Sequence, residues 1–141
     1  MTSRFHDILK SLEQMHPNTG KSANMSDTKN IRYVRLTWVD YGNTIRCRIL
    51  PWERYVNLIA TVRPGIRMPS SVFGIAGMSL AKGFSSVGSW LFVVDTDSLR
   101  LYPTEDGMAS VYGWFQYIEP SPGRDIASPL CPRSILQRVL R

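Results

Sequence analysis

The sequence is poor in the residues that build disulfide or metal frameworks. Its 141 residues include only two cysteines, Cys47 and Cys131, and two histidines, His6 and His16. Two cysteines are too few for a disulfide scaffold, and neither pair has the spacing of zinc ligands. The 11 acidic residues form no metal-ligand motif either. We therefore expect a protein of a reducing compartment without a metal site.

Long hydrophobic runs are also missing. No stretch approaches the roughly 18 uninterrupted apolar residues that a membrane-spanning helix needs. The first twenty residues include Asp7 and Glu13 and lack the apolar segment of a signal peptide. These absences predict a cytoplasmic protein that does not bind membranes.

The composition favours one folded domain. Hydrophobic residues make up 43% of the chain and charged residues 20%, which is typical of a globular protein and not of a disordered one. The 17 Lys and Arg residues outnumber the 11 Asp and Glu residues, so the formal net charge is +6. A basic surface attracts anions, and nucleic acid, an acidic substrate or an acidic partner domain would all be compatible with it.

The first thirty residues divide into a predicted helix and a predicted linker. Apolar residues recur at helical spacing near the start: Phe5, Ile8, Leu9, Leu12 and Met15. This spacing predicts an amphipathic helix over residues 1–17. Residues 18–30 are rich in Ser, Asn, Thr and Lys, and this composition predicts a flexible linker.

The clearest pattern is a β-hairpin. Apolar residues alternate over residues 31–39 and 44–50, and the turn-forming sequence Asp-Tyr-Gly-Asn separates the two segments. The inward face is expected to carry Val34, Leu36, Trp38, Ile45, Cys47 and Ile49. The outward face is expected to carry Arg35, Thr37, Arg46 and Arg48. Cys47 is thus expected to be a small buried side chain and not a nucleophile.

A helix is predicted directly after the hairpin. Pro51 suits its first position, and Pro64 with Gly65 would end it about three turns later. Apolar residues recur at helical spacing between these points: Trp52, Tyr55, Ile59 and Val62. The Gly- and Ser-rich residues 69–88 predict irregular structure. Further strands are expected over residues 90–94, 99–102 and 109–118.

The order of these elements predicts the α+β class, with a mixed sheet of about five strands packed on one main helix. We expect this domain to span residues 31–119. Four prolines fall within residues 120–132. Residues 120–141 therefore predict a linker followed, from residue 134, by the start of a helix that the chain end cuts short.

Several motifs, in the same order, resemble those of the glutamine synthetase family. Its opening hairpin has the pattern V-D-x-x-G-x-x-R-x-R-x-x-P, and the spacing of Asp40, Arg46, Arg48 and Pro51 matches it. Later segments resemble the family's following strands and its C-P-R-x-x-L-x-R lead into the catalytic domain: residues 92–95, 99–103, 107–111 and 131–140. The resemblance covers residues 31–141.

This resemblance implies the amino-terminal β-grasp domain of an oligomeric glutamate–ammonia or glutamate–amine ligase. In the family, this domain packs on a neighbouring subunit and completes the wall of its active site. The ligase reaction uses ATP with Mg²⁺ or Mn²⁺, bound by a catalytic domain that follows this one. The variant looks closest to amine-using enzymes or to the synthetase part of fused developmental proteins. We expect no catalytic residue and no ligase activity within residues 1–141.

The resemblance also indicates which positions lie at a subunit interface. They are Asp40, Asn43, Arg46, Arg48, Ala76, Gly77 and Ser79. Asn43 stands where the family has Gly, and Asn also adopts the left-handed backbone conformation. In ammonia-using members a loop with the sequence F-D-G-S-S enters the neighbouring active site, where its Asp helps to bind and deprotonate ammonium. Ala76 takes the place of that Asp, which argues against ammonia as the acceptor.

Simpler roles and other functions remain open at the level of sequence. Asp40 opens a turn and is expected to bond nearby backbone, while Arg46 and Arg48 could line a solvated face as readily as bind phosphate. A stand-alone regulatory protein that binds synthetase oligomers would keep the fold without the chemistry. A nucleic-acid-binding module needs aromatic rings on the same face as its arginines, and the predicted hairpin places them mostly on opposite faces.

Overall fold

The computed structural model describes residues 30–123 and 125–140. The helix predicted over residues 1–17 lies outside the described residues, as does the predicted linker apart from its last residue. None of the helices in the described part of the chain is long and apolar enough to cross a lipid bilayer.

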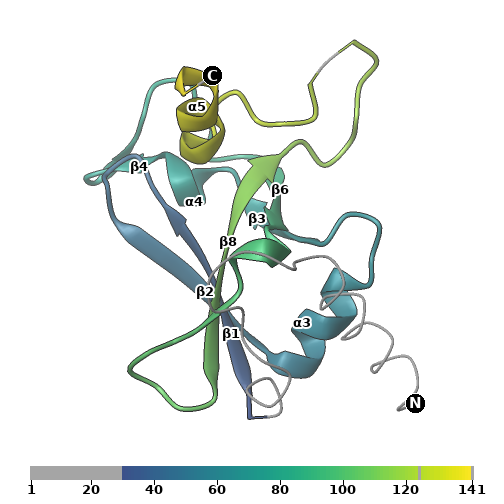
Figure 1. The fold of residues 1–141 in the computed structure, drawn as a ribbon. Coiled ribbons are helices and arrows are strands. Elements are labelled where there is room, and N and C mark those ends of the chain that lie inside the picture. Colours follow the sequence, from purple (N-terminus) through teal and green to yellow (C-terminus); the bar gives the residue numbers. More distant parts are fainter. Residues whose placement is uncertain (1–29, 124, 141) are drawn as a thin grey trace.

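A curled, mixed sheet organises the fold (Figure 1). Its order is β2-β1-β8-β6-β3, and β7 pairs with the first part of β8. The strands are β1 (Tyr33–Val39), β2 (Ile45–Pro51), β3 (Gly65–Pro69), β6 (Ser89–Val94), β7 (Arg100–Leu101) and β8 (Met108–Gln116). β1 and β8 run parallel, and all other pairs are antiparallel. The predicted mixed sheet of the α+β type is confirmed.

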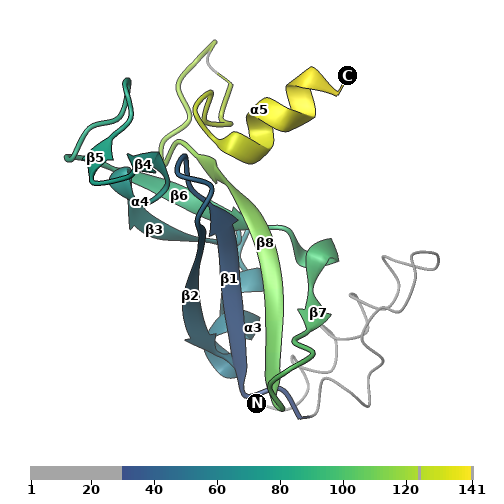
Figure 2. The ribbon, with the colours of Figure 1, turned by 90° about the vertical axis from the view of Figure 1, so that its left-hand side faces the viewer.

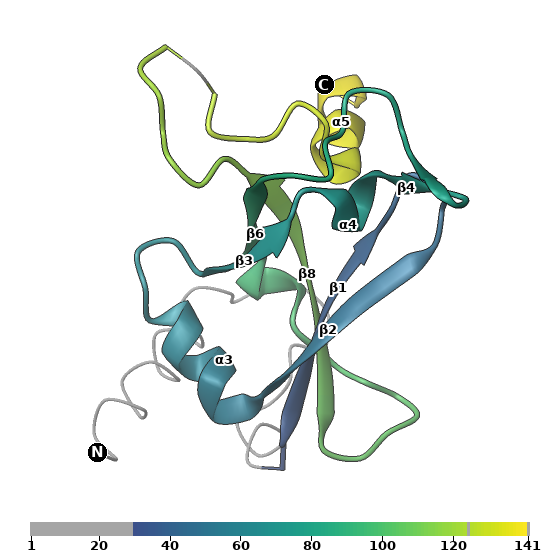
Figure 3. The same cartoon turned by 180° about the vertical axis from the view of Figure 1, so that it is seen from behind.

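The main helix, α3 (Trp52–Ile59), lies against β1 and β2 (Figure 3). It begins at Trp52, one residue after the predicted first position Pro51, and buries Tyr55 and Val56. Two shorter helices are α4 (Ser71–Gly74) and the 3₁₀ helix η1 (Thr96–Ser98). The last helix, α5 (Pro132–Val139), starts two positions before the predicted one, because proline is favoured in the first turn of a helix.

The core lies between the sheet and the helices α3 and α4. Alternate side chains of β1 point into it: Val34, Leu36 and Trp38 are 0%, 0% and 8% exposed. The rings of Phe73, from α4, and Phe115, from β8, stack with centroids 3.9 Å apart. Buried aromatic rings remove a large apolar area from water, so they supply much of the stability of a domain of this size.

Residues 69–88, predicted to be irregular, contain α4 and a hairpin of β4 (Ile75–Ala76) and β5 (Ser79–Leu80). Just before them, β3 was not predicted at all. It gains its hydrogen bonds from β6, which is distant in the sequence, so local composition gave no sign of it. The prediction for α3 was too long, since the helix ends at Ile59 and Val62 is fully exposed.

The predicted faces of the second hairpin strand were wrong. Five residues separate β1 from β2, so Leu36 lies opposite Arg48, and Trp38 lies opposite Arg46. Directly paired residues point to the same side of a sheet. Arg46 and Arg48 therefore share the core-facing side at the edge of the sheet, and Cys47 is exposed on the other side. A turn of four residues, as we had expected, would have reversed this arrangement.

The close pairing of β8 with β6 depends on a glycine. A Cβ atom added to Gly113 would lie 2.2 Å from the carbonyl oxygen of Val93, so the backbone of the central strands would have to move. We expect Gly113→Ala to lower the free energy of unfolding by about 3 kcal/mol, as measured by chemical denaturation.

Gly77→Ala provides the control for this substitution. Gly77 has a φ of +63°, but no atom lies within 4 Å of the position of its Cβ. Only backbone strain is expected there, at a cost of about 1–2 kcal/mol. Equal losses for the two variants would contradict the close approach at Gly113.

Candidate functional site

The turn between β1 and β2 is organised by the carboxylate of Asp40, which is 3% exposed. Its Oδ1 accepts hydrogen bonds from the backbone N–H groups of Gly42 and Thr44, at 2.8 and 2.9 Å. Its Oδ2 accepts the Nε–H of Arg46 at 2.7 Å. Asp40 thus holds the turn backbone, and Arg46 is the counterion of the same carboxylate.

These hydrogen bonds keep the Asp40 carboxyl ionised in spite of its burial. Burial alone would raise its pKa. The bonds from Thr44, Arg46 and Gly42 favour the charged form and outweigh that effect, so the pKa of Asp40 lies below its ordinary value. At neutral pH the group is therefore a structural anchor and not a proton donor.

Asn43 adopts the left-handed conformation, with a φ of 57°, and no other non-glycine residue in the described ranges has a positive φ. Its backbone N–H donates to the carbonyl oxygen of Asp40 at 3.1 Å. The turn therefore uses Asn in a conformation that favours glycine, as the sequence predicted.

Ala76, Gly77 and Ser79 form the short β4–β5 hairpin. Ala76 pairs with Ser79, and Gly77 takes a positive φ in the turn between them. Met78, at the tip of the hairpin, is fully exposed. The hairpin itself contains no carboxylate, so its exposed tip is apolar.

The β1–β2 turn and the β4–β5 hairpin lie side by side at one end of the sheet (Figure 2). The backbone N–H of Tyr41 donates to the carbonyl oxygen of Phe73 at 3.0 Å. A Cβ atom on Gly42 would lie 3.4 Å from the carbonyl oxygen of Ile75, in close contact. We call residues 40–44 and 75–80 the turn–hairpin cluster.

The turn–hairpin cluster brings together most of the positions predicted from the sequence. Those within it or bonded to it are Asp40, Asn43, Arg46, Ala76, Gly77 and Ser79. Arg48 is exposed further along β2, outside the cluster. The hydroxyl of Tyr41 also donates to the carbonyl oxygen of Leu130 at 2.9 Å, which connects the cluster to the segment before α5.

The cluster contains one carboxylate and no group of metal ligands among the described residues. Its single carboxylate, Asp40, is buried and engaged in hydrogen bonds. Within residues 30–123 and 125–140, no three His, Cys, Asp or Glu side chains come close enough to hold a metal ion. The arrangement therefore presents a preorganised surface whose one carboxylate is already engaged within the turn.

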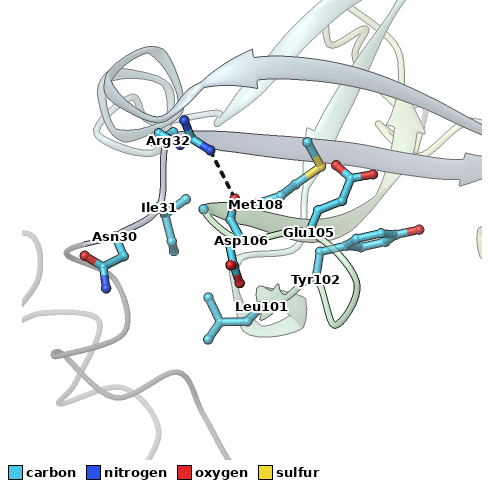
Figure 4. A pocket seen from close by; sticks show the side chains of 9 residues that line it. Asn30, Ile31, Arg32, Leu101, Tyr102, Glu105, Asp106 and Met108 are labelled. Atoms are coloured by element: carbon cyan, nitrogen blue, oxygen red, sulfur yellow. Dashed lines mark hydrogen bonds between the residues drawn. The ribbon is translucent and has the colours of Figure 1, made fainter.

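A pocket of about 500 Å³ lies at the other end of β1 (Figure 4). Side chains around it include Arg32, Tyr102, Glu105 and Asp106. Arg32 donates from Nη2 to the backbone oxygen of Asp106 at 3.3 Å. The carboxylates of Glu105 and Asp106 are both exposed. This pocket is open to solvent and holds no buried acid–base pair.

The side of β2, β1, β8 and β7 that faces away from α3 forms a further surface, which we call the outer face. Figure 2 shows these strands with α3 behind them. Strand register assigns to it Tyr33, Arg35, Thr37, Val39, Ile45, Cys47, Ile49, Arg100, Tyr102, Met108, Ser110 and Tyr112. This surface was not predicted, because the alternating pattern of the hairpin placed Ile45, Cys47 and Ile49 in the core.

The expectation that the aromatic rings lie on the face opposite the arginines was wrong for the outer face. Tyr33, Tyr102 and Tyr112 lie on the same face as Arg35 and Arg100, and not on the opposite one. The guanidinium of Arg35 lies over the ring of Tyr102, 4.5 Å from its centroid. The position of the aromatic rings therefore no longer argues against a nucleic-acid ligand.

No protein-family model matches the chain, and no curated protein matches it. Two solved structures of GmaS, a glutamine-synthetase-like γ-glutamylmethylamide synthetase, are similar to it. An ADP complex is 18% identical with a TM-score of 0.54, and a ligand-free form is 22% identical with a TM-score of 0.56. This chain has the fold of one part of GmaS.

Each comparison with GmaS covers 86% of this chain and 25% of the GmaS chain. The described chain thus spans about a quarter of the length of its structural relative. Identities this low establish a shared fold.

The buried Asp40 carboxylate gives a test of the turn. We expect Asp40→Asn to lower the free energy of unfolding at pH 7 by about 1–3 kcal/mol, because its bonds to two backbone N–H groups and Arg46 are weakened. A group whose pKa is lowered by folding stabilises the fold above its unfolded pKa, and this contribution is lost as the pH falls through the folded pKa. The difference between variant and parent should therefore shrink below about pH 4.

Asp106→Asn is the matched control, since Asp106 is exposed. Its free energy of unfolding should stay within about 0.5 kcal/mol of the parent at every pH. Denaturation series from pH 7 to pH 3 provide the comparison. If Asp40→Asn behaves like Asp106→Asn, the turn does not depend on this carboxylate.

Proposed function

We propose that this chain is a β-grasp domain of the glutamine-synthetase-like type, which packs within a glutamate–ammonia or glutamate–amine ligase and forms part of the wall of a neighbouring active site. The observation that carries the proposal is the likeness to the GmaS fold over 86% of this chain. The ordered motifs in residues 31–141 point to the same family.

The turn–hairpin cluster is the surface that we assign to the neighbouring active site. Its tip, Met78, is fully exposed, while its base is held by the hydrogen bonds of Asp40 and Tyr41. A hairpin that is ordered before binding loses less conformational entropy when a partner covers it. The cluster can therefore add an apolar contact to the wall of a site without supplying a reacting group.

The nucleotide and metal would belong to the catalytic part of such a ligase. One of the GmaS structures is an ADP complex. ATP-dependent formation of a γ-glutamyl amide needs Mg²⁺ or Mn²⁺ to stabilise the developing phosphate charge. The described residues of this chain offer no group of metal ligands. We therefore propose that this chain supports the reaction through contact alone.

The first test is to mix the purified chain with GmaS from which the matching quarter of the chain has been removed. We expect a complex by light scattering and a gain of ATP-dependent γ-glutamylmethylamide formation. The chain alone should form none. If the chain does not bind the shortened GmaS, or if it forms γ-glutamylmethylamide without it, the proposal is wrong.

Met78→Glu tests the assigned surface within that assay. A charge at the hairpin tip should weaken the complex by about tenfold or more, because the partner would bury it unpaired. Val62→Glu is the matched control, because Val62 is equally exposed but lies after α3, away from the cluster. Equal weakening by both variants would exclude a specific contact at the hairpin tip.

A further inference from the structure

The outer face is unusually apolar for an uncovered strand surface. Ile45 is 70% exposed, Ile49 51%, Tyr112 50% and Tyr33 45%. These side chains come from the neighbouring strands β2, β1 and β8, and they share one side of the sheet with Cys47, Thr37 and Arg35, which lie between them. Several large apolar side chains exposed on one side of a sheet indicate a surface for interaction.

The charges of the outer face have one sign. Arg35 and Arg100 belong to it, and none of its residues is acidic. Arg100 donates from Nη1 to the backbone oxygens of Asp97 and Leu99, at 2.9 and 2.7 Å. Arg35 has no carboxylate partner among the described residues, and its buried Nε has no hydrogen-bond acceptor there. Its Nη2 donates to the thiol sulfur of Cys47 at 3.5 Å, so the contacts of Arg35 leave its charge without an anionic partner among the described residues.

A groove continues the outer face under α5. Its volume is about 260 Å³, well above the ~30 Å³ that a water molecule occupies. Val39, Tyr112 and Leu136 line it, together with Thr37. Thr37 follows Arg35 by two residues on the same side of β1, so their Cα atoms are one strand repeat, about 7 Å, apart.

The positive charge of the outer face indicates the charge of its binding partner. A second copy of this chain carries the same net charge of +6 and the same arginines. The chain's own first 29 residues contain four Lys and Arg against three Asp and Glu, so they are not acidic either. Nucleic acid would need several free cations for its phosphates, while most of the patch is aliphatic or phenolic. An acidic segment that is not part of these 141 residues fits best.

We propose that the outer face binds a partner protein through a segment in which a carboxylate and a large apolar side chain are two residues apart. The carboxylate pairs with Arg35, and the apolar side chain enters the groove beside Thr37. The i and i+2 side chains of an extended segment point to the same side, which matches this spacing. The inference concerns a surface separate from the turn–hairpin cluster and does not depend on the ligase assignment.

The test uses the full chain, isotopically labelled, and the capped peptide Glu-Ser-Leu-Ser-Glu as the probe. Titration followed by nuclear magnetic resonance should shift the Arg35 Nε–H signal and the ring signals of Tyr112. The same peptide with Gln in place of Glu should bind at least about tenfold more weakly, and binding of the Glu peptide should weaken with added salt.

Two variants and their controls distinguish binding at the outer face from nonspecific binding elsewhere on the protein. Arg35→Gln and Ile49→Ser should each weaken binding of the Glu peptide by about tenfold. Arg67→Gln and Val62→Ser should not, because both residues are exposed outside the outer face. Ile49 is itself exposed, so its substitution leaves the core intact even if Arg35→Gln disturbs packing.

Three results would overturn the inference. The first is the absence of outer-face shifts at millimolar peptide, and the second is equal binding of the Glu and Gln peptides. The third is an oligothymidine that shifts the same signals more strongly than the peptide does, which would assign the face to single-stranded nucleic acid. The assay with shortened GmaS tests a different surface, so failure here leaves the proposed function standing.

Discussion

The buried carboxylate of Asp40 sets the geometry on which the surfaces of this protein depend. Its bonds to Gly42, Thr44 and Arg46 hold a five-residue connection between β1 and β2. That length places Arg46 opposite Trp38 and turns the following apolar residues away from the core. Because a slip of one residue reverses every side chain of a strand, the turn decides both what is buried and what is displayed.

Two surfaces of different character result from this arrangement. The turn–hairpin cluster is small and held by backbone hydrogen bonds, and it ends in the exposed side chain of Met78. The outer face is broad, apolar and positively charged, with Arg35 at its centre. Both suit contact with another protein, and neither contains the groups of an active site.

Local patterns predicted the elements that local forces stabilise. The β1–β2 hairpin, α3 after Pro51, and the strands β6 and β8 all lie close to their predicted positions. Each has a periodic apolar pattern of its own, together with a turn or a proline that marks an end. In contrast, β3 and the β4–β5 hairpin have short, mixed sequences, and β3 exists because β6 is available to pair with it. The residues of β3 themselves do not indicate that a strand about twenty residues later in the sequence will pair with them.

The sequence by itself determined the α+β class, the turn role of Asp40 and the left-handed conformation of Asn43, because each follows from spacing or from backbone preference at one position. Only the tertiary structure decided that Cys47 is exposed and that Arg35 shares a face with Tyr112. Alternation divides a strand into two sides but does not say which side faces the core. That choice depends on the length of a turn and on the helix that covers one face of the sheet.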